Sequence, residues 1–212
     1  VGSEMCIRDS NKEMINMGTM IEKSIGDAVK ALMKQDVELA QKVMAGDEEI
    51  DRTERKIEDL CLRLLLQQQP VARDLRNISA ALKMVTDMER IGDHATDISE
   101  LAIVLSEKTY VKKLDHIEEM ARETMVMLIQ SLEAYVEKDL DKAQKVIAHD
   151  DVIDDLFEEV KQELIELIRN HADEGEQAVD LLMVTKYFER IGDHATNIAE
   201  WVIFSITGQI AG

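Results

Sequence analysis

Apolar residues recur at steps of three and four along most of the chain, the spacing of one face of an α-helix. In residues 12–33 these positions are Met14, Met17, Ile21, Ile25, Ala28 and Leu32. The same pattern predicts helices over 36–45, from 47 to Pro70, from about 74 to beyond 100, and over 115–137, 139–148, 150–171 and 177–206. Asp36 is a candidate N-cap, and Gly46, Pro70 and Gly175 mark breaks. No stretch alternates with period two, so we expect an all-α protein built as an antiparallel bundle of long helices.

The second half of the chain repeats the first. Residues 36–51 align with residues 139–154 at an offset of 103. The run Glu-Arg-Ile-Gly-Asp-His-Ala-Thr occurs at 89–96 and again at 189–196. Such self-similarity predicts two copies of one unit, each with three long helices. We place the first copy at 11–106, a polar linker that acts as a hinge at 107–113, and the second copy at 114–208. Residues 1–10 fit neither pattern, and we predict that they are non-native or disordered.

Composition narrows the class of protein. Hydrophobic residues make up 45% and aromatic residues 3%, so the core must be aliphatic. The formal net charge of −19 argues against nucleic-acid binding and against direct binding to anionic lipid, because both need a basic face. Two cysteines, Cys6 and Cys61, cannot form a disulfide framework. No stretch reaches the ~18 apolar residues of a membrane span, and no signal peptide is visible. We therefore expect a cytoplasmic protein.

The last helix of each copy carries an acidic stripe. At about 100° per residue, the four carboxylates in the first copy share one ridge; they are Glu89, Asp93, Asp97 and Glu100. The second copy has Glu189, Asp193, Asn197 and Glu200 at these positions. No lysine or arginine is expected within either ridge. Like charges at this spacing destabilise a helix by a few tenths of a kcal/mol per pair, and bound cations would relieve the repulsion.

A second acidic ridge lies on the preceding helix of each copy. In the first copy it consists of Asp47, Asp51, Glu54 and Glu58; the second copy keeps Asp150 and Asp154 but has Phe157 and Lys161 in the other two places. If the two helices are antiparallel neighbours, the ridges converge. Carboxylates clustered in this way suit Mg²⁺, Ca²⁺, Mn²⁺ or iron. A solvated acidic face is the alternative, but the recurrence of the stripe in both copies favours a metal site.

Other residues of the repeated run are assigned to packing. We expect His94 and His194 to pack or form hydrogen bonds, because they project away from the ridge. Gly92 and Gly192 cost about 1 kcal/mol each in a helix relative to alanine, and close helix–helix approach would explain them. Cys61 lies among leucines and is expected to be a buried thiol.

The residues quoted above resemble the PhoU family of regulators of bacterial phosphate uptake and signalling. The motifs are the two runs at 89–98 and 189–200, residues 70–76, and the two Asp-x-x-Ile-Asp segments. The resemblance covers residues 11–208 and implies two three-helix bundles related by pseudo-symmetry. It also implies divalent or ferric metal ions, such as iron, zinc, manganese or magnesium, in some members as multinuclear clusters. The implied ligands are Glu89, Asp93, Glu189 and Asp193, with Asp47, Asp51, Asp150 and Asp154. The second site is poorer in charge, and we expect the two sites to bind unequally.

The resemblance further implies a regulator without enzyme activity that acts when phosphate is plentiful. Its implied partners are the ATPase subunit of the phosphate ABC transporter, a phosphate-sensor histidine kinase and a second copy in a homodimer, with membranes reached only through partners. One alternative is the PhoU-like cytoplasmic domain of a sodium–phosphate cotransporter. A carboxylate di-iron bundle protein is another, but its Glu-x-x-His pairs are missing at all five histidines. A plain scaffold whose stripes bind nothing is the third.

Overall fold

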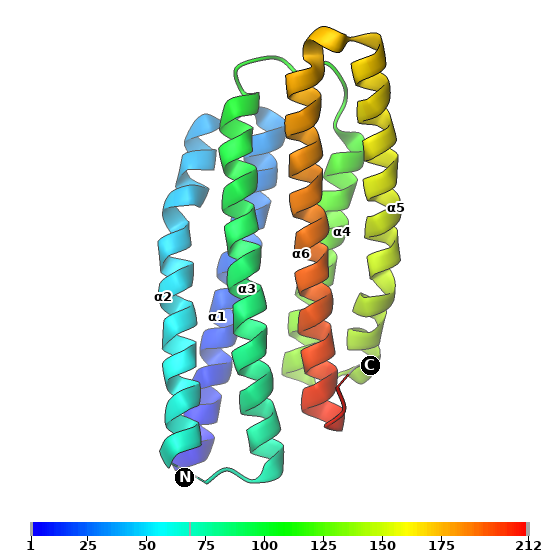
Figure 1. The fold of residues 1–212 in the computed structure, drawn as a ribbon. Helices are drawn as coiled ribbons and strands as arrows, with labels where there is room; N and C mark the ends of the chain where they lie inside the picture. The colour runs from blue at the N-terminus through cyan, green and yellow to red at the C-terminus, as the bar shows by residue number, and fades with distance from the viewer. Residues whose placement is uncertain (1, 68, 211–212) are drawn as a thin grey trace.

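The computed structural model describes residues 2–67 and 69–210. These residues form six long helices, which run along one axis (Figure 1). They are α1 (Gly2–Lys34), α2 (Val37–Gln67), α3 (Ala72–Leu105), α4 (Asp115–Glu137), α5 (Leu140–Asn170) and α6 (Gly175–Thr207), with a single 3₁₀ turn at Ala172–Glu174 before α6. The described residues contain no strand. Within the same residues, no helix has a stretch that is long and apolar enough to cross a bilayer.

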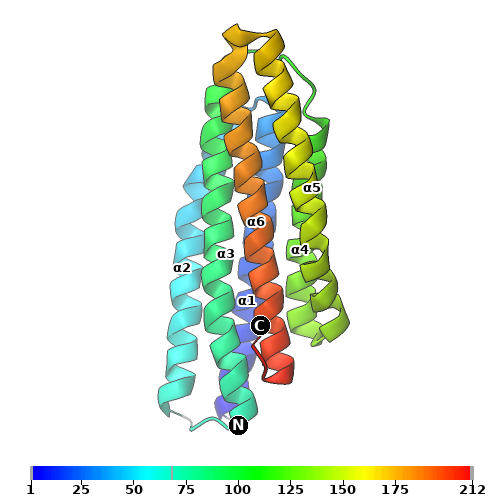
Figure 2. The same cartoon turned by 45° about the vertical axis from the view of Figure 1, so that its right-hand side comes forward.

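The two repeats lie side by side and run in opposite directions. Helices α1, α2 and α3 form one three-helix bundle, and α4, α5 and α6 form the other. Helix α3 ascends in Figure 1 while α6 descends beside it, and the turned view in Figure 2 shows the same neighbours. These two helices pack along each other, with a smaller contact between α1 and α4. The all-α architecture of two pseudo-symmetric three-helix bundles is therefore confirmed.

The buried residues follow the predicted spacing. Met14, Met17, Ile21 and Ile25 on α1 are all at most 1% exposed. Asp36 accepts a hydrogen bond from the backbone N–H of Leu39 at 3.0 Å, as expected of an N-cap. Its repeat equivalent Asp139 does the same for Lys142 at 3.0 Å.

Two predicted helix breaks are wrong. Helix α2 continues through Gly46, and α5 continues through residues 148–150, so within the described residues the expected short helices at 36–45 and 139–148 are the first parts of α2 and α5. The apolar face explains the continuity, because Ala40, Val43 and Ile50 are all buried and span the glycine at helical spacing. Their burial outweighs the cost of one helical glycine, about 1 kcal/mol.

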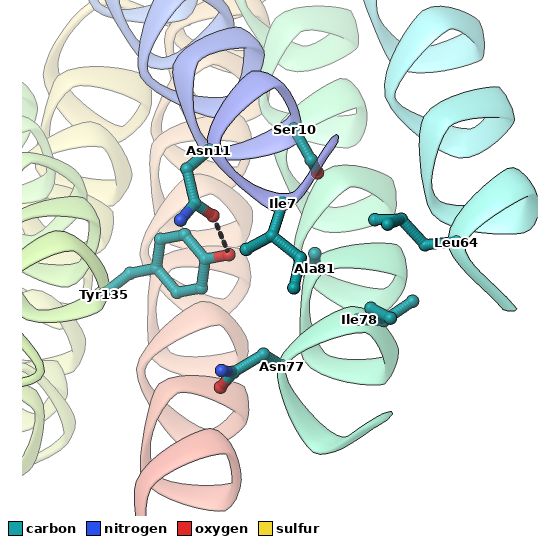
Figure 3. Close-up of a pocket in the computed structure, with 8 residues that line it drawn as sticks. All are labelled: Ile7, Ser10, Asn11, Leu64, Asn77, Ile78, Ala81 and Tyr135. Carbon is teal, nitrogen blue, oxygen red and sulfur yellow. Dashed lines mark hydrogen bonds between the residues drawn. The ribbon is translucent and has the colours of Figure 1, made fainter. Parts of the chain in front are cut away.

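Helix α1 begins earlier than predicted. Residues 2–10 are helical, whereas we expected them to fit no helical pattern; Val1 lies outside the described residues. Ser10 is 4% exposed, and its Oγ lies 3.6 Å from Sγ of the buried Cys61. Ile7 packs against the core beside Leu64 and Ile78 (Figure 3). These contacts fix the start of α1 against the rest of the bundle. That residues 1–10 are non-native stays a prediction.

The linker between the repeats is anchored, not free. The Tyr110 hydroxyl donates to the carbonyl oxygen of Leu32 at 2.6 Å. Gln177 of α6 accepts from the backbone N–H of Val111 at 2.9 Å and donates to the carbonyl oxygen of Thr109 at 3.2 Å. The linker is thus bonded to both repeats, and the two bundles are joined along α3 and α6.

Candidate metal centre

Glycine brings the two acidic helices of each repeat together. A Cβ atom at Gly92 would lie 3.2 Å from Cδ1 of Ile50 and 3.5 Å from Oδ1 of Asp47. At Gly192 it would lie 3.5 Å from Cγ2 of Ile153 and 3.7 Å from Oδ1 of Asp150. The close approach that we expected from these glycines is confirmed, and it is tighter in the first repeat. It places an aspartate of one helix directly against the backbone of the next.

The first repeat gathers three carboxylates at this point. Asp47 and Asp51 of α2 and Asp93 of α3 each offer an oxygen atom, and the three oxygens lie within 4.8 Å of one another. Ligand oxygens on opposite sides of a hard divalent ion are roughly 4–5 Å apart. Oδ1 of Asp47 and Oδ1 of Asp51 are buried and have no hydrogen-bond partner among the described residues. Buried carboxylate oxygens without a donor fit a metal ion as the missing partner.

The electrostatics of this group also favour a cation. Burial raises the pKa of Asp47 to about 6, with further contributions from Asp51 and Asp93. Burial and the neighbouring carboxylates raise the pKa of Glu54 to about 7. For Glu89, burial and then Asp93 raise the pKa to about 8. Asp47, Glu54 and Glu89 therefore resist carrying charge beside Asp51 and Asp93, and a bound cation would relieve the repulsion. We call these five residues the first carboxylate site.

Asp97 lies at the edge of that site. Its charge contributes, as the smallest cause, to the raised pKa of Asp47. Its Oδ2 atom lies 3.3 Å from Nδ1 of His94. The His94 ring in turn stacks on the rings of Tyr187 and His194 in the other repeat, at 5.6 and 5.5 Å between ring centres. Asp97 thus connects the first carboxylate site with the seam between the repeats.

The second repeat brings together Asp150 and Asp154 of α5 with Glu189 and Asp193 of α6, which we call the second carboxylate site. Burial, then Asp154 and Asp193, raise the pKa of Asp150 to about 6. Oδ1 of Asp150 is buried without a hydrogen-bond partner among the described residues. Burial and the adjacent carboxylates also raise the pKa of Asp193.

A lysine reaches the second site from outside the acidic ridge, which the spacing along α6 did not predict. The ammonium of Lys186 donates a hydrogen bond to Oε1 of Glu189. It also lies 5.3 Å from the centre of the Phe157 ring. Lys186 aligns with Thr86 of the first repeat and Phe157 with Glu54, so comparing the repeats in the sequence could have found this pair.

Asn197 is directed away from the second site. Its side-chain amide donates to Oδ1 of Asp87 on α3 at 3.2 Å. The same oxygen lies 2.9 Å from Nδ1 of His194. His94 and His194 therefore make the packing and hydrogen-bonding contacts that we expected of them. Asp87 gives no signal in the sequence, because its partners come from the other repeat.

Comparison with protein families follows the same two repeats. The family model described as the PhoU domain matches residues 14–102 and again residues 117–202. The chain belongs to the PhoU family. Its two PhoU domains are the two three-helix bundles, and each contributes one carboxylate site.

Individual PhoU proteins match along nearly the whole chain. The phosphate-specific transport system accessory protein PhoU homolog of Clostridium acetobutylicum is 40% identical over 207 residues, which are 97% of this chain and 94% of that protein. The Aquifex aeolicus homolog is 36% identical over 204 residues, 96% of this chain and 92% of that one. The crystal structure of PhoU from Pseudomonas aeruginosa has a TM-score of 0.94 at 33% identity, over 97% of this chain and 99% of that chain. The regulatory protein PhoU from Streptococcus pneumoniae shares the fold, with a TM-score of 0.91 at 24% identity.

Proposed function

We propose that this protein is a non-enzymatic, metal-binding regulator of phosphate uptake and of phosphate-responsive two-component signalling. It restrains both when phosphate is plentiful. Membership of the PhoU family across both repeats is the observation that carries the proposal. The relatives bear the name of accessory proteins of a phosphate-specific transport system. The resemblance supplies the finer expectations: an ATPase subunit and a sensor histidine kinase as partners, a homodimer, and action in the cytoplasm.

The first carboxylate site supports the metal-binding part of the proposal. Asp47, Asp51 and Asp93 supply three converging oxygens, and Glu54 and Glu89 lie beside them. An all-oxygen ligand set suits manganese, magnesium or iron. The ion would neutralise part of the clustered charge and tie α2 to α3, so we infer that its role is structural or regulatory.

A complementation assay tests the regulatory role. A bacterial strain that lacks its own PhoU protein and carries a reporter for a phosphate-starvation promoter is grown in ample phosphate. We expect this chain to restore repression of the reporter, and Asp93→Ala to restore it less well. Asp173→Asn, an exposed acid in the 3₁₀ turn, is the matched control and should behave like the unaltered chain. Failure of the unaltered chain to repress the reporter, although it is expressed and folded, would contradict the proposed function.

A binding assay tests the partners separately. The purified chain is immobilised and exposed to the ATPase subunit of a phosphate ABC transporter, and in parallel to the cytoplasmic part of a phosphate-sensor kinase. Both are expected to bind. If one of the two proteins does not bind, that partner is removed from the proposal, and the other partner is unaffected.

A further inference from the structure

The two carboxylate sites lie on equivalent helices, but the repeats differ at a pair of positions, one on each helix of the site. In the first repeat the pair is Glu54 and Thr86, and in the second it is Phe157 and Lys186. One carboxylate has been lost and one ammonium gained at the same end of the site. The remaining acidic positions, Asp47, Asp51, Glu89 and Asp93, are all kept as acids in the second repeat.

Lys186 is held over the second site by contacts to both of its helices. Its ammonium donates to Glu189 one helical turn away on α6, and its charge also acts on Asp154 and Asp193. From α5, the ring of Phe157 lies 5.3 Å from the ammonium, within the range of a cation–π contact. The Lys186 side chain is 40% exposed, so it lies between the site and the solvent-exposed surface of the bundle.

The first site has no such cation among the described residues. Arg90 comes closest by distance, with Nε 4.0 Å from Oε2 of Glu89, but its side chain is 62% exposed and lies at the rim. The charge of Arg55, next to Glu54 in the chain, lowers the pKa of Glu54, but burial and the neighbouring carboxylates outweigh it. Thr86 is exposed, and its hydroxyl donates back to the carbonyl oxygen of Leu82 at 3.3 Å. Within the part of the chain that the structure describes, only Asp47, Asp51 and Asp93 bring three ligand oxygens within 4.8 Å of one another.

We propose that Lys186 is a tethered cation that fills the second carboxylate site in place of a metal ion, so that the protein binds metal in its first repeat. This inference rests on the proposed metal-binding role of the first site. A metal ion entering the second site must first displace the ammonium from Glu189 and from the Phe157 ring. A hydrogen bond between charged groups and a cation–π contact together correspond to about a tenfold or larger loss of metal affinity.

The two repeats offer reciprocal substitutions as a test. Lys186→Thr copies the first repeat into the second, and Thr86→Lys does the reverse. Lys186→Met removes the charge but keeps an aliphatic chain over Phe157, which guards against a folding defect in the threonine variant. Lys145→Thr removes the same charge from the exposed side of α5 and is the control.

Binding is measured by titrating each purified full-length variant with Mn²⁺ and counting free Mn²⁺ by electron paramagnetic resonance. For the unaltered chain we expect binding that Asp93→Ala abolishes and Asp193→Ala leaves in place. Lys186→Thr and Lys186→Met should bind additional Mn²⁺, and Asp193→Ala should remove the addition. Thr86→Lys should weaken binding at the first site about tenfold or more, while Lys145→Thr should match the unaltered chain.

The outcomes separate the two proposals. If the unaltered chain binds Mn²⁺ and both Lys186 variants bind no more than it does, the tethered cation is refuted and the metal-binding role stands. The tethered cation is also refuted if Asp193→Ala lowers Mn²⁺ binding while Lys186 is present. If the unaltered chain binds none, the metal-binding role of the first site fails. In that case Mn²⁺ binding that appears only in the Lys186 variants still supports the tethered cation.

Discussion

Replacing the mid-helix glycine by alanine should stabilise the protein in the second repeat but not in the first. Alanine is favoured over glycine in a helix interior by about 1 kcal/mol. At Gly192 the added Cβ meets its nearest atoms at 3.5–3.7 Å, which is ordinary contact, so Gly192→Ala should stabilise the protein by about that amount. At Gly92 the Cβ lies 3.2 and 3.3 Å from two atoms of Ile50, a core residue that is only 2% exposed. Both atoms belong to a β-branched side chain that is stiff at χ1, so it cannot swing away easily. Overpacking of this kind costs about 1–3 kcal/mol, which makes Gly92→Ala neutral to about 2 kcal/mol destabilising.

Thermal unfolding of the two metal-free variants checks this difference. For a chain of this length 1 kcal/mol corresponds to a Tm shift of roughly 2–4 °C, so the Tm values should differ by at least about 2 °C. Gly92→Ala should also weaken Mn²⁺ binding, because its Cβ would lie only 3.2 and 3.3 Å from two atoms of Ile50 and would push α2, with Asp47 and Asp51, away from Asp93. Equal stabilisation by both substitutions would refute the reasoning, since α2 would then not be held as close to α3 as the distances indicate.

Three further predictions concern the carboxylates, the linker and the helix caps. Burial and then Asp93 raise the pKa of Glu89 to about 8 in the folded state, so the metal-free protein should lose stability as pH rises from about 4.5 to 8. Thermal melts at a series of pH values should show a smaller loss of stability for Glu89→Gln. An equal loss would mean that other groups cause the pH dependence. Gln177→Ala removes two hydrogen bonds to the linker and should cost about 1–3 kcal/mol. It should also speed proteolysis between residues 106 and 114, and unchanged cleavage would contradict the anchoring. Asp139→Ala removes the cap of α5 and should cost about 1 kcal/mol in urea unfolding, whereas Asp139→Asn should cost less.

The fold follows from the sequence except where a local signal competes with packing. Helical spacing of apolar residues and the internal repeat predict both bundles, because these features determine which faces must be buried. Local propensity alone predicts a helix break at Gly46, but the burial of the residues on either side of it keeps α2 continuous. The start of α1 likewise depends on tertiary packing. The contact of Ser10 with Cys61 joins residues 51 apart, and no local pattern reveals it.

The site is predictable along each helix but not across helices. Spacing alone places Asp47 with Asp51 on one helix and Glu89 with Asp93 on another, and the glycine between them predicts the close approach. Spacing along a helix does not predict which neighbouring residue a side chain will contact. Asn197 shares the spacing of Asp97, yet its amide reaches Asp87 in the other repeat. Lys186 lies in the turn before Glu189, outside the acidic ridge, and only its long side chain brings its charge into the site.

Comparing the two repeats separates the residues that determine how the helices pack from the residues that determine the charge of the site. Both copies have a glycine at the crossing, which lets the two helices approach closely, and aspartates beside it. The charge at the far end of the site is under no such constraint, since Thr86 and Lys186 both lie toward solvent and either side chain fits the helix. Divergence there changes the ionic content of a site without changing the fold. An internal duplication can therefore keep two carboxylate sites on equivalent helices and still, as we propose, hold a metal ion in one of them and a lysine in the other.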